Sequence, residues 1–149
     1  MLGRVFGARF FIVLSAVLAL GACQAVPPAP PLAVTYEATN EATKNALVTA
    51  FSSAGYQIRR DSQFQLVFDK PNTTFAATML YGSNFNGVPN SRVTLTITNS
   101  QPTRVNVAIA IVTNPGSGFE NASDFSQNPE AQAAVSSHLE RARAILAQG

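Results

Sequence analysis

Two alternating stretches determine the fold of this 149-residue chain: Arg92-Val93-Thr94-Leu95-Thr96-Ile97-Thr98 and Arg104-Val105-Asn106-Val107-Ala108-Ile109-Ala110-Ile111. In both, a large aliphatic residue alternates with a polar or small residue. This pattern is typical of a β-strand with one packed face and one uncovered face. The linker of residues 99–103 contains Ser100 and Pro102, which suit a turn. We therefore predict an antiparallel hairpin.

The alternation also predicts how the two strands pair. On the buried face, a turn at residues 99–103 pairs Ile97 with Val105, Leu95 with Val107 and Val93 with Ile109. On the other face it pairs Thr98 with Arg104, Thr96 with Asn106 and Thr94 with Ala108. A shift by one residue would move the aliphatic side chains to the wrong face, so the register is strongly specified.

Segments before the hairpin show the same alternation. We expect a short strand beginning with Tyr56 and Ile58, a second with Phe64, Leu66 and Phe68 on one face, and a third with Phe75, Ala77, Met79 and Tyr81 on one face. The second strand should stop at Pro71, because proline cannot donate to a ladder. Together with the hairpin, these segments predict an antiparallel sheet of about five strands.

Two helices flank the strands. Residues 41–54 repeat apolar side chains at helical spacing, with Asn40 as the expected cap and Gly55 at the end. After an irregular stretch from Asn114 to about Gln127, Asn128-Pro129-Glu130 starts a second helix that runs to Ala147. This order predicts an α+β domain with the N-terminal and C-terminal helices packed on one face of the sheet.

The N-terminus has the pattern of an export signal. Arg4 and Arg9 precede an apolar run from Phe10 to Leu20, which continues into Leu20-Gly21-Ala22-Cys23. The run spans only about half a bilayer core, so we do not expect a permanent membrane helix. The last four residues resemble the lipobox of bacterial lipoproteins. This resemblance implies that residues 1–22 are removed and that Cys23 receives acyl chains such as palmitate. The alternative is an ordinary secretory signal with a cysteine at the cut site.

The segment after Cys23 is expected to be a tether. Pro27-Pro28-Ala29-Pro30-Pro31 favours an extended polyproline conformation, so residues 23–35 should hold the domain away from the membrane. A proline-rich ligand for another protein is the alternative. Residues 36–149 are enough for one domain and too few for two. Gln24, which is not Asp, resembles the outer-membrane default of enteric lipoproteins and implies a periplasm-facing location.

The charge balance argues against nucleic-acid binding. The chain has ten Lys and Arg against eight Asp and Glu, and removal of Arg4 and Arg9 with the signal leaves eight of each. The remaining positive charges are scattered and form no basic stripe. A neutral mature domain attached by acyl chains fits this composition better.

The sequence offers little for catalysis. His138 is the only histidine and lies within the second helix, and Ser117 lies in Gly116-Ser117-Gly118, which lacks the spacing of a nucleophile elbow. One histidine and one cysteine cannot form the usual zinc sites. We therefore expect no enzyme activity, no metal and no cofactor other than the lipid on Cys23.

Two surfaces are candidates for binding. The first is the outward face of the hairpin, with the small side chains Thr94, Thr96, Thr98, Asn106, Ala108 and Ala110. A plain solvent-exposed face is one interpretation, and a docking surface for an envelope protein or a second copy is the other. The second candidate is the loop from Tyr81 to Asn90, with Tyr81, Asn84, Phe85 and Asn86. Together with residues 114–128 it could bind a glycan or peptide, although Asn86-Gly87 is also a turn signal.

The order of elements, together with Gly55-Tyr56-Gln57-Ile58 after the first helix, is similar to the helix-grip domains of the third lipoprotein of the outer-membrane β-barrel assembly machinery. The resemblance covers residues 36–147 and implies a helix-grip arrangement. No site motif of that family is matched, so no functional residue is carried over. The leading hypothesis is a non-enzymatic, membrane-anchored module for protein binding or envelope assembly, and the alternative is a glycan- or peptide-binding lipoprotein.

Overall fold

A computed structural model describes residues 30–74, 81, 87–98 and 101–148. The predicted signal, Cys23 and most of the tether lie outside these residues, as do residues 75–80 of the third expected strand. The described residues form eight elements: β1 (Ala33–Tyr36), α2 (Asn40–Ser53), β2 (Gln57–Asp61), β3 (Gln65–Pro71), β4 (Asn90–Thr98), β5 (Thr103–Thr113), β6 (Asn121–Asp124) and α4 (Pro129–Leu146).

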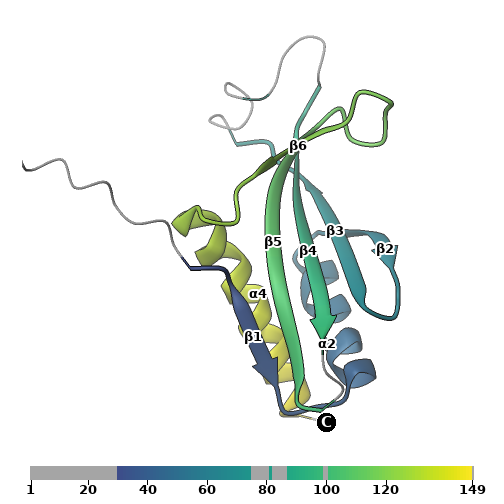
Figure 1. Cartoon of the computed structure of the whole chain (residues 1–149), viewed down its shortest axis with the longest axis vertical. Coiled ribbons are helices and arrows are strands. Elements are labelled where there is room, and N and C mark those ends of the chain that lie inside the picture. Colours follow the sequence, from purple (N-terminus) through teal and green to yellow (C-terminus); the bar gives the residue numbers. More distant parts are fainter. Residues whose placement is uncertain (1–29, 75–80, 82–86, 99–100, 149) are drawn as a thin grey trace, which may run out of the picture.

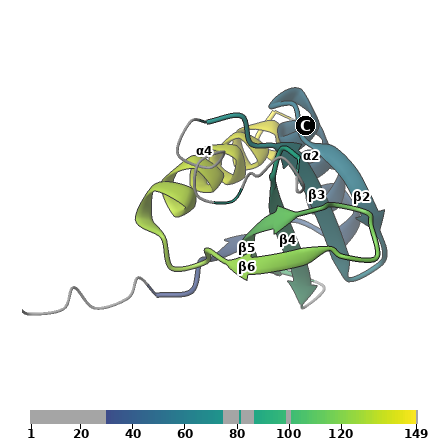
Figure 2. The same cartoon turned by 90° about the horizontal axis from the view of Figure 1, so that it is seen from above.

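The strands form one antiparallel sheet in the order β1-β5-β4-β3-β2, and β6 also pairs with β5. Helices α2 and α4 lie side by side on one face of this sheet (Figures 1 and 2). The predicted α+β class and the placement of both helices on one face are therefore confirmed.

The predicted hairpin register is also confirmed. Ile97 pairs with Val105, Leu95 with Val107 and Val93 with Ile109, while Thr98 pairs with Arg104, Thr96 with Asn106 and Thr94 with Ala108. All six aliphatic side chains are buried and belong to the core beneath the helices. Burial of each such side chain contributes about 1.5–3 kcal/mol, which explains why the alternation specifies one register.

The helices complete this core. Phe51 of α2 is fully buried, and its ring stacks on Phe68 of β3 with centroids 4.8 Å apart. From α4, Leu139 packs into the same cluster. Tyr36 joins from β1, and its hydroxyl donates a hydrogen bond to the Leu139 carbonyl at 3.0 Å. The helix that follows the first strand and the helix that ends the chain are thus held to the same sheet face.

The predicted helix ends hold with one correction. Asn128 caps α4, since its Oδ1 accepts from the Ala131 amide at 2.9 Å, and Gly55 after α2 has φ of +85°. The cap of α2 is Thr39, not Asn40. Thr39 has the extended backbone that a cap requires, and its Oγ1 accepts from the Ala42 amide. Asn40 is already helical, and its Oδ1 accepts from the Thr103 hydroxyl instead.

Two short strands on one edge of β5 were not expected from the sequence. β1 begins at Ala33, so residues 33–35, expected in the tether, belong to the sheet. β6 lies within the stretch expected to be irregular, and all four of its residues are exposed. β1 does alternate, with Val34 packed against the core and Tyr36 buried in it, but its four residues are too few to predict a strand. β6 buries no side chain and is held mainly by backbone pairing with β5.

Phe64 differs from its expected position. Its side chain is 58 % exposed, whereas Leu66 and Phe68 are buried as predicted. The reason is a turn between β2 and β3, where the Ser62 amide donates to the Gln65 carbonyl at 2.9 Å. The regular alternation therefore begins only at Gln65, and Phe64 lies outside the strand.

Candidate functional site on the outer sheet face

The face of the sheet opposite the helices, here called the outer face, contains all six residues predicted as a binding surface. They come from alternate positions of β4 and β5, and the pairing places them in adjacent rows: Thr94, Thr96, Thr98, Asn106, Ala108 and Ala110. Among the described residues, no helix covers this face. The structure therefore brings these small side chains together as one surface.

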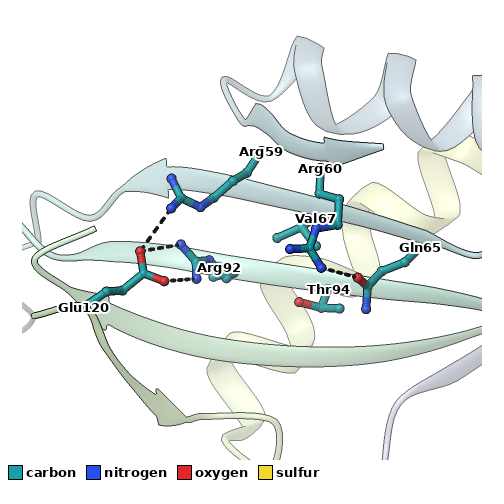
Figure 3. A pocket seen from close by; sticks show the side chains of 7 residues that line it. All are labelled: Arg59, Arg60, Gln65, Val67, Arg92, Thr94 and Glu120. Carbon is teal, nitrogen blue, oxygen red and sulfur yellow. Dashed lines mark hydrogen bonds and ion pairs between the residues drawn. The ribbon is translucent and has the colours of Figure 1, made fainter. Parts of the chain in front are cut away.

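A groove of about 540 Å³ lies beside this surface (Figure 3). Its lining comes from β2, β3, β4 and the loop of residues 114–120: Arg59, Arg60, Gln65, Val67, Arg92, Thr94 and Glu120. Thr94 is the only one of the six predicted surface residues in this lining. The groove thus extends the predicted surface toward β2 and changes its character, because five of the seven side chains are charged or carry an amide.

The two consecutive arginines reach the groove through a β-bulge. Ile58 pairs with Phe68 and Arg60 pairs with Val67, so Arg59 is an extra residue in β2. In a regular strand, adjacent side chains point to opposite faces, but a bulge can place two of them on the same face. Figure 3 shows Arg59 and Arg60 both directed into the groove. The tandem arginine is visible in the sequence, but its shared orientation is not.

Arg92 is the centre of a network of ion pairs. It donates to Asp69 through Nε at 2.7 Å and through Nη2 at 2.8 Å, and to Glu120 through Nη1 at 2.6 Å. Arg59 adds a second contact to Glu120 at 3.2 Å. Asp69 is buried, so loss of this pairing would leave a buried polar group without partners. The network joins the 114–120 loop to the strands.

The contacts between Arg92 and Glu120 favour the charged state of both groups. The hydrogen bond from Arg92, followed by that from the Gly116 amide, lowers the pKa of Glu120 from 4.5 to about 2. In return, hydrogen bonds to Asp69 and Glu120 raise the pKa of Arg92 further above its usual value. Both groups are therefore ionised throughout the neutral range, and the network is a fixed part of the groove wall.

Arg60 differs from the other two arginines. Among the residues that the structure describes, its side chain donates one hydrogen bond, a long one of 3.5 Å to the Gln65 amide oxygen. Within the described part of the chain, it has no carboxylate within ion-pair distance. The two carboxylates, Asp69 and Glu120, pair with Arg59 and Arg92. The charge of Arg60 is therefore the one positive charge in the groove that no carboxylate of the described residues balances.

Of the other predicted candidates, only Tyr81 belongs to the described residues, and it does not line the groove. Tyr81 is half-buried, and its ring meets that of Phe125 edge-on with centroids 5.8 Å apart. Asn84, Phe85 and Asn86 lie outside the described residues, as does Cys23. His138 packs against the rings of Phe51 and Tyr56, and burial, followed by the charges of Lys70 and Arg141, lowers its pKa.

The part of the chain that is described contains no cluster of three or more His, Cys, Asp or Glu side chains able to hold a metal ion. Within the same residues, neither the length nor the hydropathy of any helix is sufficient for a membrane span. No protein-family model matches the chain, and no match is found among curated proteins.

Proposed function

We propose that this chain is a non-enzymatic lipoprotein of the bacterial envelope whose domain binds another protein through the outer face. The observation that supports the proposal best is the difference between the two sheet faces. Both helices pack on the inner face, whereas the outer face presents small side chains beside a groove. Side chains such as Ala108 and Thr96 lose little conformational entropy when they are covered, which favours docking.

The proposed attachment rests on the N-terminal sequence. Leu20-Gly21-Ala22-Cys23 resembles a lipobox, and acylation of Cys23 would anchor the mature chain to a membrane. The proposed location is the outer membrane, with the domain facing the periplasm. Each buried methylene contributes about 0.8 kcal/mol, so several acyl chains form a stable anchor without help from basic residues. The proline-rich segment would then separate the domain from the bilayer.

The anchor can be tested by metabolic labelling with a palmitate analogue in the cells that produce the protein. The wild-type chain should be labelled and should fractionate with membranes. A Cys23→Ser variant should lose the label and be released from the membrane fraction. Unchanged labelling and fractionation of this variant would contradict the proposed lipid attachment.

Protein binding can be tested by photo-crosslinking in the same cells. A photoreactive amino acid is placed at Thr96 or Ala108 on the outer face, and at Ala133 of α4 as the control, because both alanines are exposed. We expect one defined protein to be captured from Thr96 and Ala108 and not from Ala133. Equal capture from all three positions, or none from the outer face, would argue against a docking surface there.

A further inference from the structure

The positive charge of Arg60 is the feature of the groove that the contacts among the lining residues do not balance. Arg92 and Arg59 are occupied by Asp69 and Glu120, and these pairs are needed because Asp69 is buried. Arg60 neutralises neither of the two acids. Its single bond of 3.5 Å to neutral Gln65 is close to the limit for a hydrogen bond and contributes little.

Protection of an edge strand is the simplest alternative role for a charge on β2. β2 pairs only with β3 among the described residues, and all of its residues are exposed. Charged side chains on such a strand discourage association with other strands. Figure 3, however, shows the Arg60 side chain directed across the groove, above Val67 and toward Gln65. This orientation places the guanidinium over the sheet face, where a bound partner could meet it.

The charge and shape of the groove restrict what Arg60 can bind. One unmatched positive charge is balanced by one carboxylate, and a planar guanidinium binds a carboxylate through two parallel hydrogen bonds. A phosphate group carries about two negative charges and would leave one unbalanced near Glu120. Val67, which is 8 % exposed, and Thr94 also line the groove. The surface next to Arg60 therefore consists of small, uncharged side chains.

We propose that Arg60 binds the side-chain carboxylate of an aspartate or glutamate on the partner protein that docks on the outer face. This inference rests on the proposed protein-binding function and adds the chemistry of the contact. The acidic residue occupies the β2 end of the groove, and the neighbouring residues of the partner cover the small side chains around Thr96 and Ala108. Arg59 and Arg92 hold the groove wall and do not need to release their own carboxylates.

The matched control is Arg104. It is also an exposed arginine of the outer face, opposite Thr98, but it does not line the groove. Both Arg60→Gln and Arg104→Gln remove one positive charge from the same face. A general electrostatic attraction would therefore be weakened equally by the two variants, whereas a specific carboxylate contact depends on Arg60 alone.

The test uses the full chain in the cells that produce it, with the photoreactive residue at Thr96. We expect Arg60→Gln to reduce capture of the partner by about tenfold, because a hydrogen-bonded ion pair is lost, and Arg60→Glu to reduce it further. Arg104→Gln should change capture by less than about twofold. The thermal unfolding midpoint of the purified Arg60 variants should stay unchanged, since the long bond to Gln65 is the only hydrogen bond or ion pair of this side chain among the described residues.

A charge exchange then identifies the contact itself. Mass spectrometry of the crosslinked product locates the captured segment, which should contain an aspartate or glutamate. Replacing that residue by arginine should restore capture by the Arg60→Glu variant. A segment without an acidic residue, an equal loss in Arg104→Gln, failure of the exchange, or capture of lipid in place of protein would each overturn the inference.

The two proposals fail in different ways. If a defined protein is captured from Thr96 whatever residue occupies position 60, the carboxylate contact is wrong and the docking function stands. If the wild-type chain captures no protein from either Thr96 or Ala108, both proposals are wrong.

Discussion

The inner and outer faces of the β4–β5 hairpin come from the same two strands but are held by different forces. On the inner face, aliphatic side chains such as Leu95 are buried against the helices, and their positions follow from alternation alone. On the outer face, small side chains adjoin a groove whose wall is an ion-pair network drawn from β2, β3, β4 and the 114–120 loop. The inner face should therefore govern stability, and the outer face should govern recognition.

The largest expected effect is a loss of unfolding free energy, and it should separate two adjacent residues that lie on opposite faces. Leu95 is fully buried, so Leu95→Ala should lower the free energy of unfolding by about 2–5 kcal/mol through lost burial and a cavity. Thr96 is partly exposed on the outer face, and Thr96→Ala should cost about 0.5 kcal/mol. Urea denaturation followed by circular dichroism measures both values. Similar losses for the two variants would remove the distinction between the faces.

The next largest effect should come from the buried acid on the outer face. Asp69 is 6 % exposed and accepts two hydrogen bonds from Arg92. Asp69→Asn should destabilise the domain by about 2 kcal/mol, because a neutral amide replaces the buried carboxylate that accepts two hydrogen bonds from Arg92.

The control for this variant is the exposed ion pair of Glu140 with Arg143 on α4. Glu140→Gln should change the unfolding free energy by less than about 0.5 kcal/mol, since water screens that pair. Equal destabilisation by Asp69→Asn and Glu140→Gln, measured by urea denaturation, would show that burial does not strengthen the outer-face network.

A smaller effect should appear in acid and report on the outer face. The pKa of Glu120 is lowered from 4.5 to about 2 in the folded state, so the folded protein resists protonation more than the unfolded chain does. Its contribution to stability is therefore complete above pH 4.5 and is lost as the pH falls through about 2. Glu120→Gln should be less stable than wild type at pH 7, and the difference should shrink as the pH approaches 2 in urea titrations. A constant difference would contradict the ionic role of Glu120.

The smallest effect should come at mild acidity from His138 of α4, one of the two helices that cover the inner face. Burial and the charges of Lys70 and Arg141 lower the pKa of His138, so the folded state favours the neutral ring. Protonation then favours the unfolded chain, and stability should fall as the pH drops below the unfolded pKa of about 6.5. His138→Gln should lose less stability between pH 7 and pH 5 than wild type does. A steeper fall in this variant would show that other groups dominate this range.

The fold could be predicted from the sequence where a local pattern of side chains is enough to determine an element or its pairing. The alternation in β4 and β5 determined their pairing, because any other register would expose aliphatic surface. Asn128-Pro129 likewise determined the start of α4 through local cap chemistry. β1 and β6 could not be predicted in this way, since each has only four residues and is a strand because it meets the edge of β5 in the folded domain.

The candidate site was predictable only in part. The six small residues of the outer face follow from the same alternation as the core, and the structure places them together. The groove beside them does not follow from it, since Asp69 and Glu120 are distant from each other in sequence and are joined through Arg92 and Arg59. The tandem Arg59-Arg60 carried a visible signal, but ordinary strand periodicity assigns these two residues to opposite faces.

Local pattern and composition thus determined both helices, the β4–β5 hairpin with its register, the buried face of that hairpin and the expectation of a lipid anchor at Cys23. These features depend on neighbours in sequence and on the large free energy of apolar burial, which favours one arrangement. Only the tertiary structure decided that a bulge turns two consecutive arginines to one face and that a distant loop supplies Glu120. Polar contacts of this kind depend on where separate segments meet in space, and for that reason the unmatched charge of Arg60 became visible only in the folded domain.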